Sequence, residues 1–234
     1  LYNYSFLDAV SELAQRAGIK LELIDSKKIK EENVVKKILL ATNNWFIKNL
    51  DDSGAETCRK YLKERNLTQP TIDKFKLGYS YNRNSTLFEY LKNLSFDEKD
   101  IIKSNVVRVD KNNKIKDYFF KRLIFPIFDE RSNIVGFGGR CLDNSNPKYI
   151  NSPESTFFQK RYLLYNLAEA KLFARKKNNL LVCEGYMDVI SLYQRGIQSV
   201  VSPLGTALTE EQLNLAWKFS TKPTIMFDGD KAGL

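Results

Sequence analysis

Carboxylate side chains directly follow two short apolar segments toward the end of this 234-residue sequence. Glu184 follows residues 181–183, and Asp228 and Asp230 follow residues 225–227. Short apolar runs between turn signals are typical of buried strands. Ligands of parallel sheets bind at the edge formed by the carboxyl ends of the strands. The pattern therefore predicts that the three carboxylates meet at one edge of a sheet.

A divalent cation is the ligand that this arrangement favours. Asp228 and Asp230 are two residues apart, so their side chains point to the same side of an extended chain. Asp188 would return to the same edge if a helix begins near Gly185. Like charges raise one another's pKa, and a bound cation relieves this. Without histidine or clustered cysteines, the ligands must be oxygens, which suit Mg²⁺ or Mn²⁺.

The composition excludes several other kinds of site. Because the sequence has no histidine, it can build neither a Ser-His-Asp nor a Cys-His nucleophile, nor a histidine-ligated zinc site. It has no G-x-x-x-x-G-K-[ST] motif, and Gly136, Gly138 and Gly139 do not match a dinucleotide-binding loop. Contacts to phosphate groups are therefore expected from side chains.

Basic residues are concentrated just before the acidic segment. The net charge is +9; residues 118–179 contain 11 Lys and Arg against 5 Asp and Glu, whereas residues 180–234 contain 4 against 6. A basic surface beside a carboxylate site suits a polyanionic ligand. The side chains expected to contact phosphates or bases are Arg122, Arg140, Lys148, Tyr149, Lys160 and Arg161.

The elements that position these residues follow from hydrophobic periodicity. Residues 180–234 alternate strands with helices, which predicts a parallel sheet with crossover helices. The strands are expected at 180–183, 199–202 and 224–227, and the helices at 188–195 and 209–219.

The preceding segment mixes helices and strands, so the predicted fold class is α/β, with an α+β N-terminal part before a parallel α/β part. Residues 25–33 are polar and charged and are expected to form a linker. Helices are predicted over 5–17, 34–50, 55–66, 71–75, 86–94, 96–104 and 164–176. Strands are predicted over 106–109, 115–119, 123–128, 134–139 and 148–151. No run is long enough to span a membrane, and the first residues do not resemble a signal peptide.

Several motifs together resemble those of DnaG-type bacterial primases. Glu184-Gly-Tyr-Met-Asp188, followed by Asp228-Gly-Asp230-Lys-Ala-Gly233, resembles the family's Toprim signature. Upstream, in family order, come Phe-Lys-Leu-Gly-Tyr at 75–79, Phe-Pro-Ile at 125–127, Gly-Phe-Gly-Gly-Arg at 136–140 and Pro-Lys-Tyr-Ile-Asn-Ser-Pro at 147–153. The resemblance covers essentially the whole chain.

The resemblance implies a site and a domain organisation. The metal-binding carboxylates would be Glu184, Asp228 and Asp230, with Asp188 nearby. Residues 1–24 would be the last helix of a zinc-binding domain, 25–33 a linker, 34–179 a basic α+β subdomain and 180–234 the first half of a Toprim subdomain. The positions near template and nucleotide would be Arg122, Arg140, Lys148, Asn151 and Lys160.

The resemblance also implies an activity and its partners. The family synthesises short RNA primers on single-stranded DNA from nucleoside triphosphates, using Mg²⁺ or Mn²⁺, as two ions, in the bacterial cytoplasm. The partners would be the template, the triphosphates, the RNA primer and, through a further C-terminal domain, the replicative helicase. Zinc would belong to a further N-terminal domain, and no membrane is expected.

Three departures from the family pattern bear on these expectations. The zinc ligands are absent, Phe120 occupies a usually basic position, and the sequence ends at Leu234, before further metal-ligand aspartates. The isolated chain is therefore expected to be weakly active or inactive. Two alternatives remain open at this point: a Toprim nuclease or topoisomerase, which would nick supercoiled DNA without nucleotides, and a nucleic-acid-binding or nucleotide-binding module without turnover.

Overall fold

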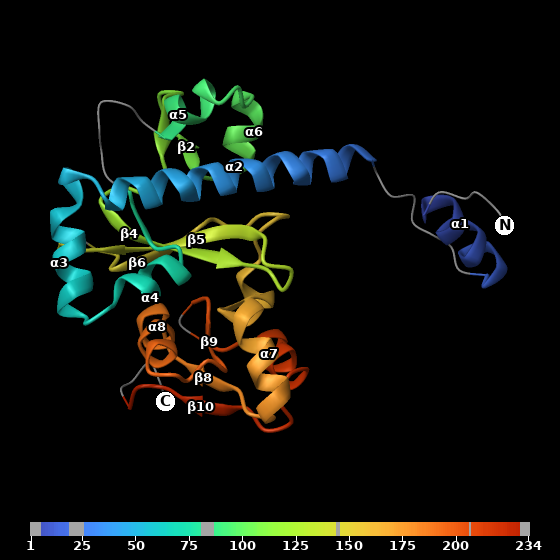
Figure 1. Ribbon diagram of the computed structural model, residues 1–234. Helices are drawn as coiled ribbons and strands as arrows, with labels where there is room; N and C mark the ends of the chain where they lie inside the picture. Colours follow the sequence, from blue (N-terminus) through green and yellow to red (C-terminus); the bar gives the residue numbers. More distant parts are fainter. Residues whose placement is uncertain (1–5, 19–25, 81–86, 144–145, 206, 230–234) are drawn as a thin grey trace. The chain divides into compact units, whose positions relative to one another are not determined.

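The computed structural model describes residues 6–18, 26–80, 87–143, 146–205 and 207–229, and its ribbon is drawn in Figure 1. The chain divides into two compact units, Leu1–Val34 and Val35–Leu234. In the first unit, helix α1 (Phe6–Arg16) ends before Gly18, whose φ of +68° suits a residue without a side chain.

Helix α2 (Ser26–Leu50) is longer than its predicted range of 34–50. Residues 26–33, expected as part of a linker, are helical. Lys and Glu dominate this segment, and both are good helix formers, so a polar sequence here does not mean an irregular backbone.

The larger unit contains an N-terminal antiparallel sheet in the order β1-β4-β5-β6. Its strands are β1 (Gly78–Ser80), β4 (Arg122–Phe128), β5 (Ile134–Cys141) and β6 (Tyr149–Asn151). Strand β1 was not predicted, because three fully buried residues carry no alternating pattern. Phe46 of α2 packs on this sheet through an edge-to-face contact with Phe137, with the ring centroids 5.4 Å apart.

Smaller elements surround this sheet and largely match their predicted ranges. The helices are α3 (Glu56–Glu64), α4 (Gln69–Lys74), α5 (Leu87–Asn93) and α6 (Glu98–Lys103). Strands β2 (Val107–Val109) and β3 (Ile115–Asp117) form the predicted hairpin. The side chain of Asp110 closes the turn of this hairpin by accepting hydrogen bonds from the backbone N–H groups of Asn112 and Lys114.

The C-terminal sheet has the order β10-β8-β9-β7. As predicted, β8 (Leu181–Cys183), β9 (Val200–Pro203) and β10 (Thr224–Met226) are parallel, and α8 (Tyr186–Gln194) and α9 (Glu210–Trp217) lie between them in sequence. Residues 164 and 165, predicted as helical, instead form β7 (Leu164–Tyr165), antiparallel to β9. Asn166, whose backbone is in the left-handed region with a φ of +67°, separates β7 from α7 (Leu167–Lys177), so the helix begins later than predicted.

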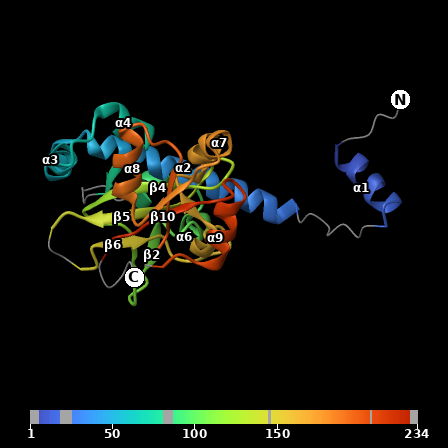
Figure 2. The same ribbon diagram turned by 90° about the horizontal axis from the view of Figure 1, so that it is seen from below.

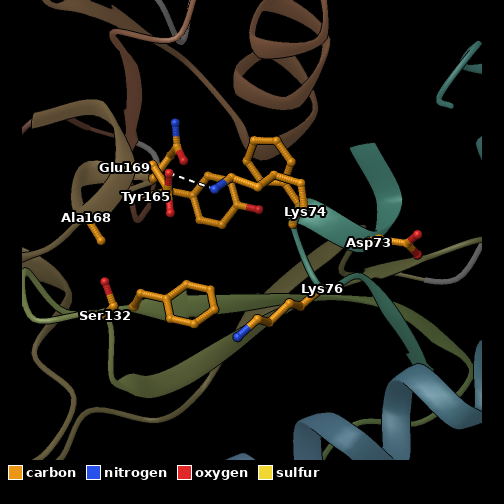
Figure 3. A pocket seen from close by; sticks show the side chains of 10 residues that line it. Asp73, Lys74, Lys76, Ser132, Tyr165, Ala168 and Glu169 are labelled. Carbon is orange, nitrogen blue, oxygen red and sulfur yellow. Dashed lines mark ion pairs between the residues drawn. The ribbon is translucent and has the colours of Figure 1, made fainter. Parts of the chain in front are cut away.

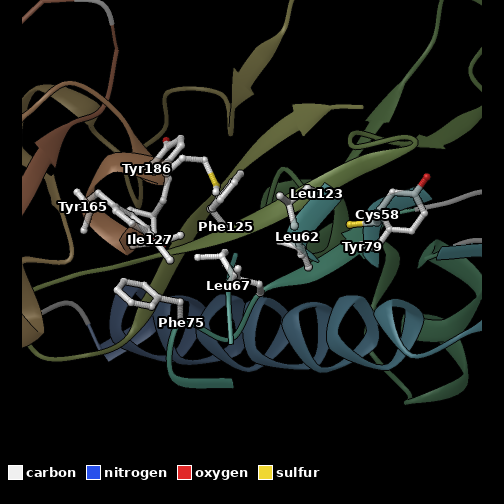
Figure 4. Packing of buried hydrophobic residues seen from close by; sticks show 14 of the residues in the cluster. Cys58, Leu62, Leu67, Phe75, Tyr79, Leu123, Phe125, Ile127, Tyr165 and Tyr186 are labelled. Carbon is white, nitrogen blue, oxygen red and sulfur yellow. The ribbon is translucent and has the colours of Figure 1, made fainter. Parts of the chain in front are cut away.

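One hydrophobic core joins the two sheets (Figure 4). Leu123, Phe125 and Ile127 of β4 pack with Tyr165 and Tyr186 of the C-terminal part, all less than a tenth exposed. The residues on either side of position 179 therefore fold around shared apolar side chains, which fixes β5 and β6 relative to α8.

The glycines of β5 allow aromatic rings to lie directly on the strand. A Cβ atom at Gly138 would lie 2.7 Å from the Tyr186 ring, and one at Gly136 would lie 2.6 Å from the Phe158 ring. Real Cβ atoms do not approach so closely, so only glycine fits here. The glycines serve packing in a strand, consistent with the absence of a dinucleotide-binding loop.

Among the described residues, no helix combines the length and the apolar character needed to cross a membrane.

Candidate nucleic-acid and metal site

An open cleft of about 500 Å³ lies where β5 and β6 meet the start of α8. Figure 2 shows β5 and β6 side by side, with α8 next to them. The cleft has a basic side from α3, β5 and the residues at β6, and an acidic side from the ends of β8 and β10. Its charged and polar lining residues are Arg65, Arg140, Lys148, Tyr149, Asn151, Glu184, Asp188 and Asp228.

The acidic side follows from the register of the parallel strands. Because Met226 of β10 pairs with Cys183 of β8, Glu184 and Asp228 leave the sheet at the same edge. The backbone N–H of Asp228 donates a hydrogen bond to Glu184 Oε2 over 3.2 Å. The structure thus brings together two of the three carboxylates predicted to meet there; Asp230 lies outside the described residues.

Asp188 lies in the first turn of α8, where its Oδ2 accepts a hydrogen bond from the Gly185 N–H over 3.1 Å. Partial burial raises the pKa of this carboxyl, and the charge of Asp228 adds to the rise. The Gly185 N–H and the Arg65 guanidinium oppose it. Ionising Asp188 beside Asp228 therefore has a cost that a cation would offset.

The donor set of this edge suits a hard cation, because carboxylate oxygens are the ligands that Mg²⁺ and Mn²⁺ prefer. Within the part of the chain that the structure describes, however, no three Asp, Glu, Cys or His side chains come close enough to enclose an ion. The described carboxylates therefore do not enclose an ion by themselves.

The basic side is built around Arg140. It is the cross-strand partner of Tyr149, and its Nη1 donates a hydrogen bond to the Tyr149 hydroxyl over 2.5 Å. Burial raises the pKa of Tyr149, and Arg140 opposes the rise. Asn151 Oδ1 accepts a hydrogen bond from the Tyr186 hydroxyl over 2.6 Å. Arg140, Tyr149 and Asn151 are thus held by contacts within the cleft wall.

Three of the predicted basic residues do not line the cleft. One of them, Arg161, forms an ion pair with Glu211 of α9. Arg122 is only 9% exposed, and its Nη1 donates to the carbonyl oxygens of Gly139, Pro147 and Lys148 over 3.0–3.3 Å. Lys160 lies in a short 3₁₀ turn, with its Nζ 3.9 Å from Glu154 Oε1. Direct contacts of these three residues with a ligand remain predictions.

Arg65 is a lining residue that sequence reasoning missed. It is the C-terminal cap of α3, and a basic residue at that position is ordinary. Only the packing of α3 against the N-terminal sheet brings it to the cleft, so no local motif marks it.

A second pocket, of about 300 Å³, lies between α4, the β4–β5 turn and the start of α7 (Figure 3). Its walls include the aromatic residues Phe75, Phe128 and Tyr165. The Lys74 ammonium is 2.8 Å from Glu169, so these two charges already compensate each other. None of the predicted site residues lines this pocket, which leaves the larger cleft as the candidate site.

Comparisons with known protein families match almost the whole larger unit. The family described as "DNA primase catalytic core, N-terminal domain" matches residues 45–171, and the Toprim domain matches residues 178–234. The DNA primase of Clostridium acetobutylicum is 39% identical over 99% of this chain and 39% of its own length. The DNA primase of Aquifex aeolicus is 36% identical over 98% of this chain and 45% of its own length. The chain spans less than half the length of these relatives.

Solved structures agree with these matches. The DnaG primase catalytic domain bound to single-stranded DNA superposes with a TM-score of 0.77 at 32% identity, covering 88% of this chain and 66% of that one. The zinc-binding and RNA polymerase domains of the Aquifex aeolicus primase give a TM-score of 0.78 at 34% identity, covering 99% and 56%.

Proposed function

The chain belongs to the DNA primase family, and on that premise we propose that it forms part of a catalytic core that synthesises short RNA primers on single-stranded DNA. One observation carries the proposal: a single cleft joins carboxylates at a sheet edge to arginine and lysine side chains. Nucleotidyl transfer requires both, because the reacting groups are phosphates and the charge that develops on them needs cations.

The acidic side is the proposed metal site, with Glu184, Asp228 and Asp230 as ligands and Asp188 beside them. Mg²⁺ or Mn²⁺, as two ions, would neutralise the triphosphate and polarise its α-phosphorus. Glu184 also fixes the chain after β10, because it accepts a hydrogen bond from the Asp228 N–H. The two acidic segments would thereby hold their oxygens in place before a nucleotide arrives.

The basic side is the proposed contact surface for template and triphosphate. Arg65, Arg140 and Lys148 offer charged donors to phosphate oxygens. Tyr149 is proposed to stack on a base, and Asn151 and Lys160 to contact template or nucleotide. The Arg122 guanidinium donates a hydrogen bond to the carbonyl oxygen of Lys148. Arg122 would therefore contribute to ligand binding indirectly, by holding the backbone that carries Lys148.

The remaining partners are inferred from the family. They are the RNA primer, the replicative helicase and a zinc ion. The helicase and the zinc ion would be bound by regions outside this chain, and the protein would act in the bacterial cytoplasm. Within the chain we propose the remnant of a zinc-binding domain at 1–24, a linker segment at 25–33, a basic subdomain at 34–179 and half of a Toprim subdomain at 180–234.

The match over residues 45–171 disfavours the two alternatives. A Toprim nuclease or topoisomerase would share the C-terminal sheet, but the matching N-terminal domain is that of a primase core. A binding module without turnover would not account for carboxylates and basic side chains that line the same cleft.

The proposal is tested by the Mg²⁺-dependent synthesis of dinucleotides by the full-length protein. Glu184→Gln and Asp228→Asn keep the side-chain volume but remove the charge, and each should lower the rate by about a hundredfold or more. Single-stranded DNA binding should change little, because the basic side is intact. Glu98→Gln, on the exposed face of α6, is the matched control and should synthesise at the rate of the unaltered protein. Undiminished synthesis by Glu184→Gln would rule out the proposed metal site.

A further inference from the structure

Guanidinium groups and tyrosine rings alternate along the basic side of the cleft. The Arg65 Cζ atom lies 5.2 Å from the centroid of the Tyr61 ring, and the Arg140 Cζ atom lies 4.7 Å from it. Arg140 is also 5.2 Å from the Tyr149 ring centroid. Arg65, Arg140 and Tyr149 line the cleft, whereas Tyr61 does not. One ring behind the cleft wall therefore contacts both arginines.

The secondary structure explains these neighbours. Tyr61 and Arg65 are four residues apart at the end of α3, a spacing that places side chains on the same helix face. Arg140 and Tyr149 are cross-strand partners on β5 and β6. The contact between Tyr61 and Arg140 is thus the one that joins the helix to the sheet within this group.

The ring of Tyr61, rather than its hydroxyl, makes these contacts. The hydroxyl oxygen is buried and has no hydrogen-bond partner among the described residues. A buried hydroxyl without a partner contributes nothing favourable to the fold. Phenylalanine should therefore replace Tyr61 without loss, whereas an aliphatic side chain should not.

An aromatic ring is suited to hold two like charges. The negative face of its quadrupole attracts each guanidinium, which offsets part of the repulsion between them. Arginine side chains lose rotational freedom when they bind a ligand. Guanidiniums that are already stacked have lost much of that freedom before binding, so less affinity is given up when phosphate groups arrive.

We propose that Tyr61 is a positioning residue, which holds the guanidiniums of Arg65 and Arg140 toward the cleft for the phosphate groups of a bound ligand. The inference rests on the proposed function, since it assigns those two arginines to phosphate binding. The phosphates belong either to single-stranded DNA or to a nucleoside triphosphate, and separate measurements distinguish the two.

The experiment uses the full-length protein with Tyr61→Leu and Tyr61→Phe. Fluorescence anisotropy measures binding of a labelled single-stranded oligonucleotide, and calorimetry measures binding of a nucleoside triphosphate with Mg²⁺. Tyr61→Leu should bind about tenfold more weakly in one or both assays, and the assay affected identifies the ligand. Tyr61→Phe should restore binding to within about twofold, a rescue that separates the ring from the hydroxyl.

Controls separate this inference from the proposed function. Phe219→Leu removes a similar contact, with Arg175 Cζ 4.8 Å from the ring, at a place that does not line the cleft, and should not alter binding. Arg140→Ala and Arg65→Ala test the proposed function itself, because they should weaken binding whatever Tyr61 does. If they do so while Tyr61→Leu binds normally, or if Tyr61→Phe binds as weakly as Tyr61→Leu, the inference about Tyr61 is wrong. If the two arginine variants bind normally, the proposed basic side is wrong.

Discussion

Arg122 and Arg140 have the same side chain and lie on adjacent strands, yet they occupy opposite faces of the sheet. Arg140 pairs with Leu123, the neighbour of Arg122, and successive side chains along a strand point to opposite faces. Arg122 is therefore enclosed among backbone carbonyls, while Arg140 lines the cleft. Residue type and motif predicted both as ligand contacts. The register that separates them cannot be read from one sequence, because it depends on which strand pairs with which.

The buried position of Arg122 yields a test at this scale. Arg122→Met would leave the carbonyl groups of Gly139, Pro147 and Lys148 without their donor. A lost charged hydrogen bond and unsatisfied buried acceptors together should lower the free energy of unfolding by about 3 kcal/mol, measured by urea denaturation. Arg131→Met, in the exposed turn after β4, should change it by less than about 0.5 kcal/mol. Equal stabilities of the two variants would contradict the structural role of Arg122.

Among the elements, helix α8 connects the acidic edge to the N-terminal part of the larger unit. It begins beside Glu184 and ends at Gln194, which contacts the loop between α3 and α4. Gln194 Oε1 accepts the Thr68 N–H over 2.8 Å, and its Nε2 donates to the Asn66 carbonyl over 2.8 Å. Periodicity predicted α8 and the parallel strands well. It missed β1, whose three buried residues do not alternate, and β7, whose two residues lie just before α7 and were assigned to that helix.

The contact of Gln194 predicts how strongly α8 is tied to that loop. Gln194→Ala removes two hydrogen bonds to backbone groups, each worth about 1 kcal/mol net, so the free energy of unfolding should fall by about 2 kcal/mol. Chemical denaturation of the full-length protein measures this. Gln159→Ala, at an exposed position, is the control. A fall no larger than that of the control would show that the loop is held by other contacts.

At the scale of the whole molecule, the basic and acidic segments of the sequence form the two sides of one cleft. The basic residues before position 180 and the acidic ones after it belong to different sheets, and the shared core brings them together. Charge counts predicted that a basic surface would adjoin the carboxylates. They did not reveal Arg65, which reaches the cleft from a helix far earlier in the sequence.

This arrangement predicts a salt dependence of single-stranded DNA binding. Each phosphate neutralised on a single strand contributes about −0.7 to the slope of log K against log salt concentration. Arg65, Arg140 and Lys148 together should therefore contribute a slope of about −2. Titration of an oligonucleotide at several NaCl concentrations measures it, and Lys148→Ala should make the slope shallower by about 0.7. An unchanged slope in that variant would show that Lys148 contacts no phosphate of the bound strand.

The glycine at position 138 has a mechanical consequence. The Tyr186 ring rests directly on the backbone of β5 there, with no side chain between them to absorb a movement. Tyr186 is two residues beyond Glu184, and Gly138 is two residues before Arg140. We therefore expect a displacement of the acidic edge to be passed on to the strand that carries the arginine, which would preserve the spacing of the two sides of the cleft while a ligand enters or leaves.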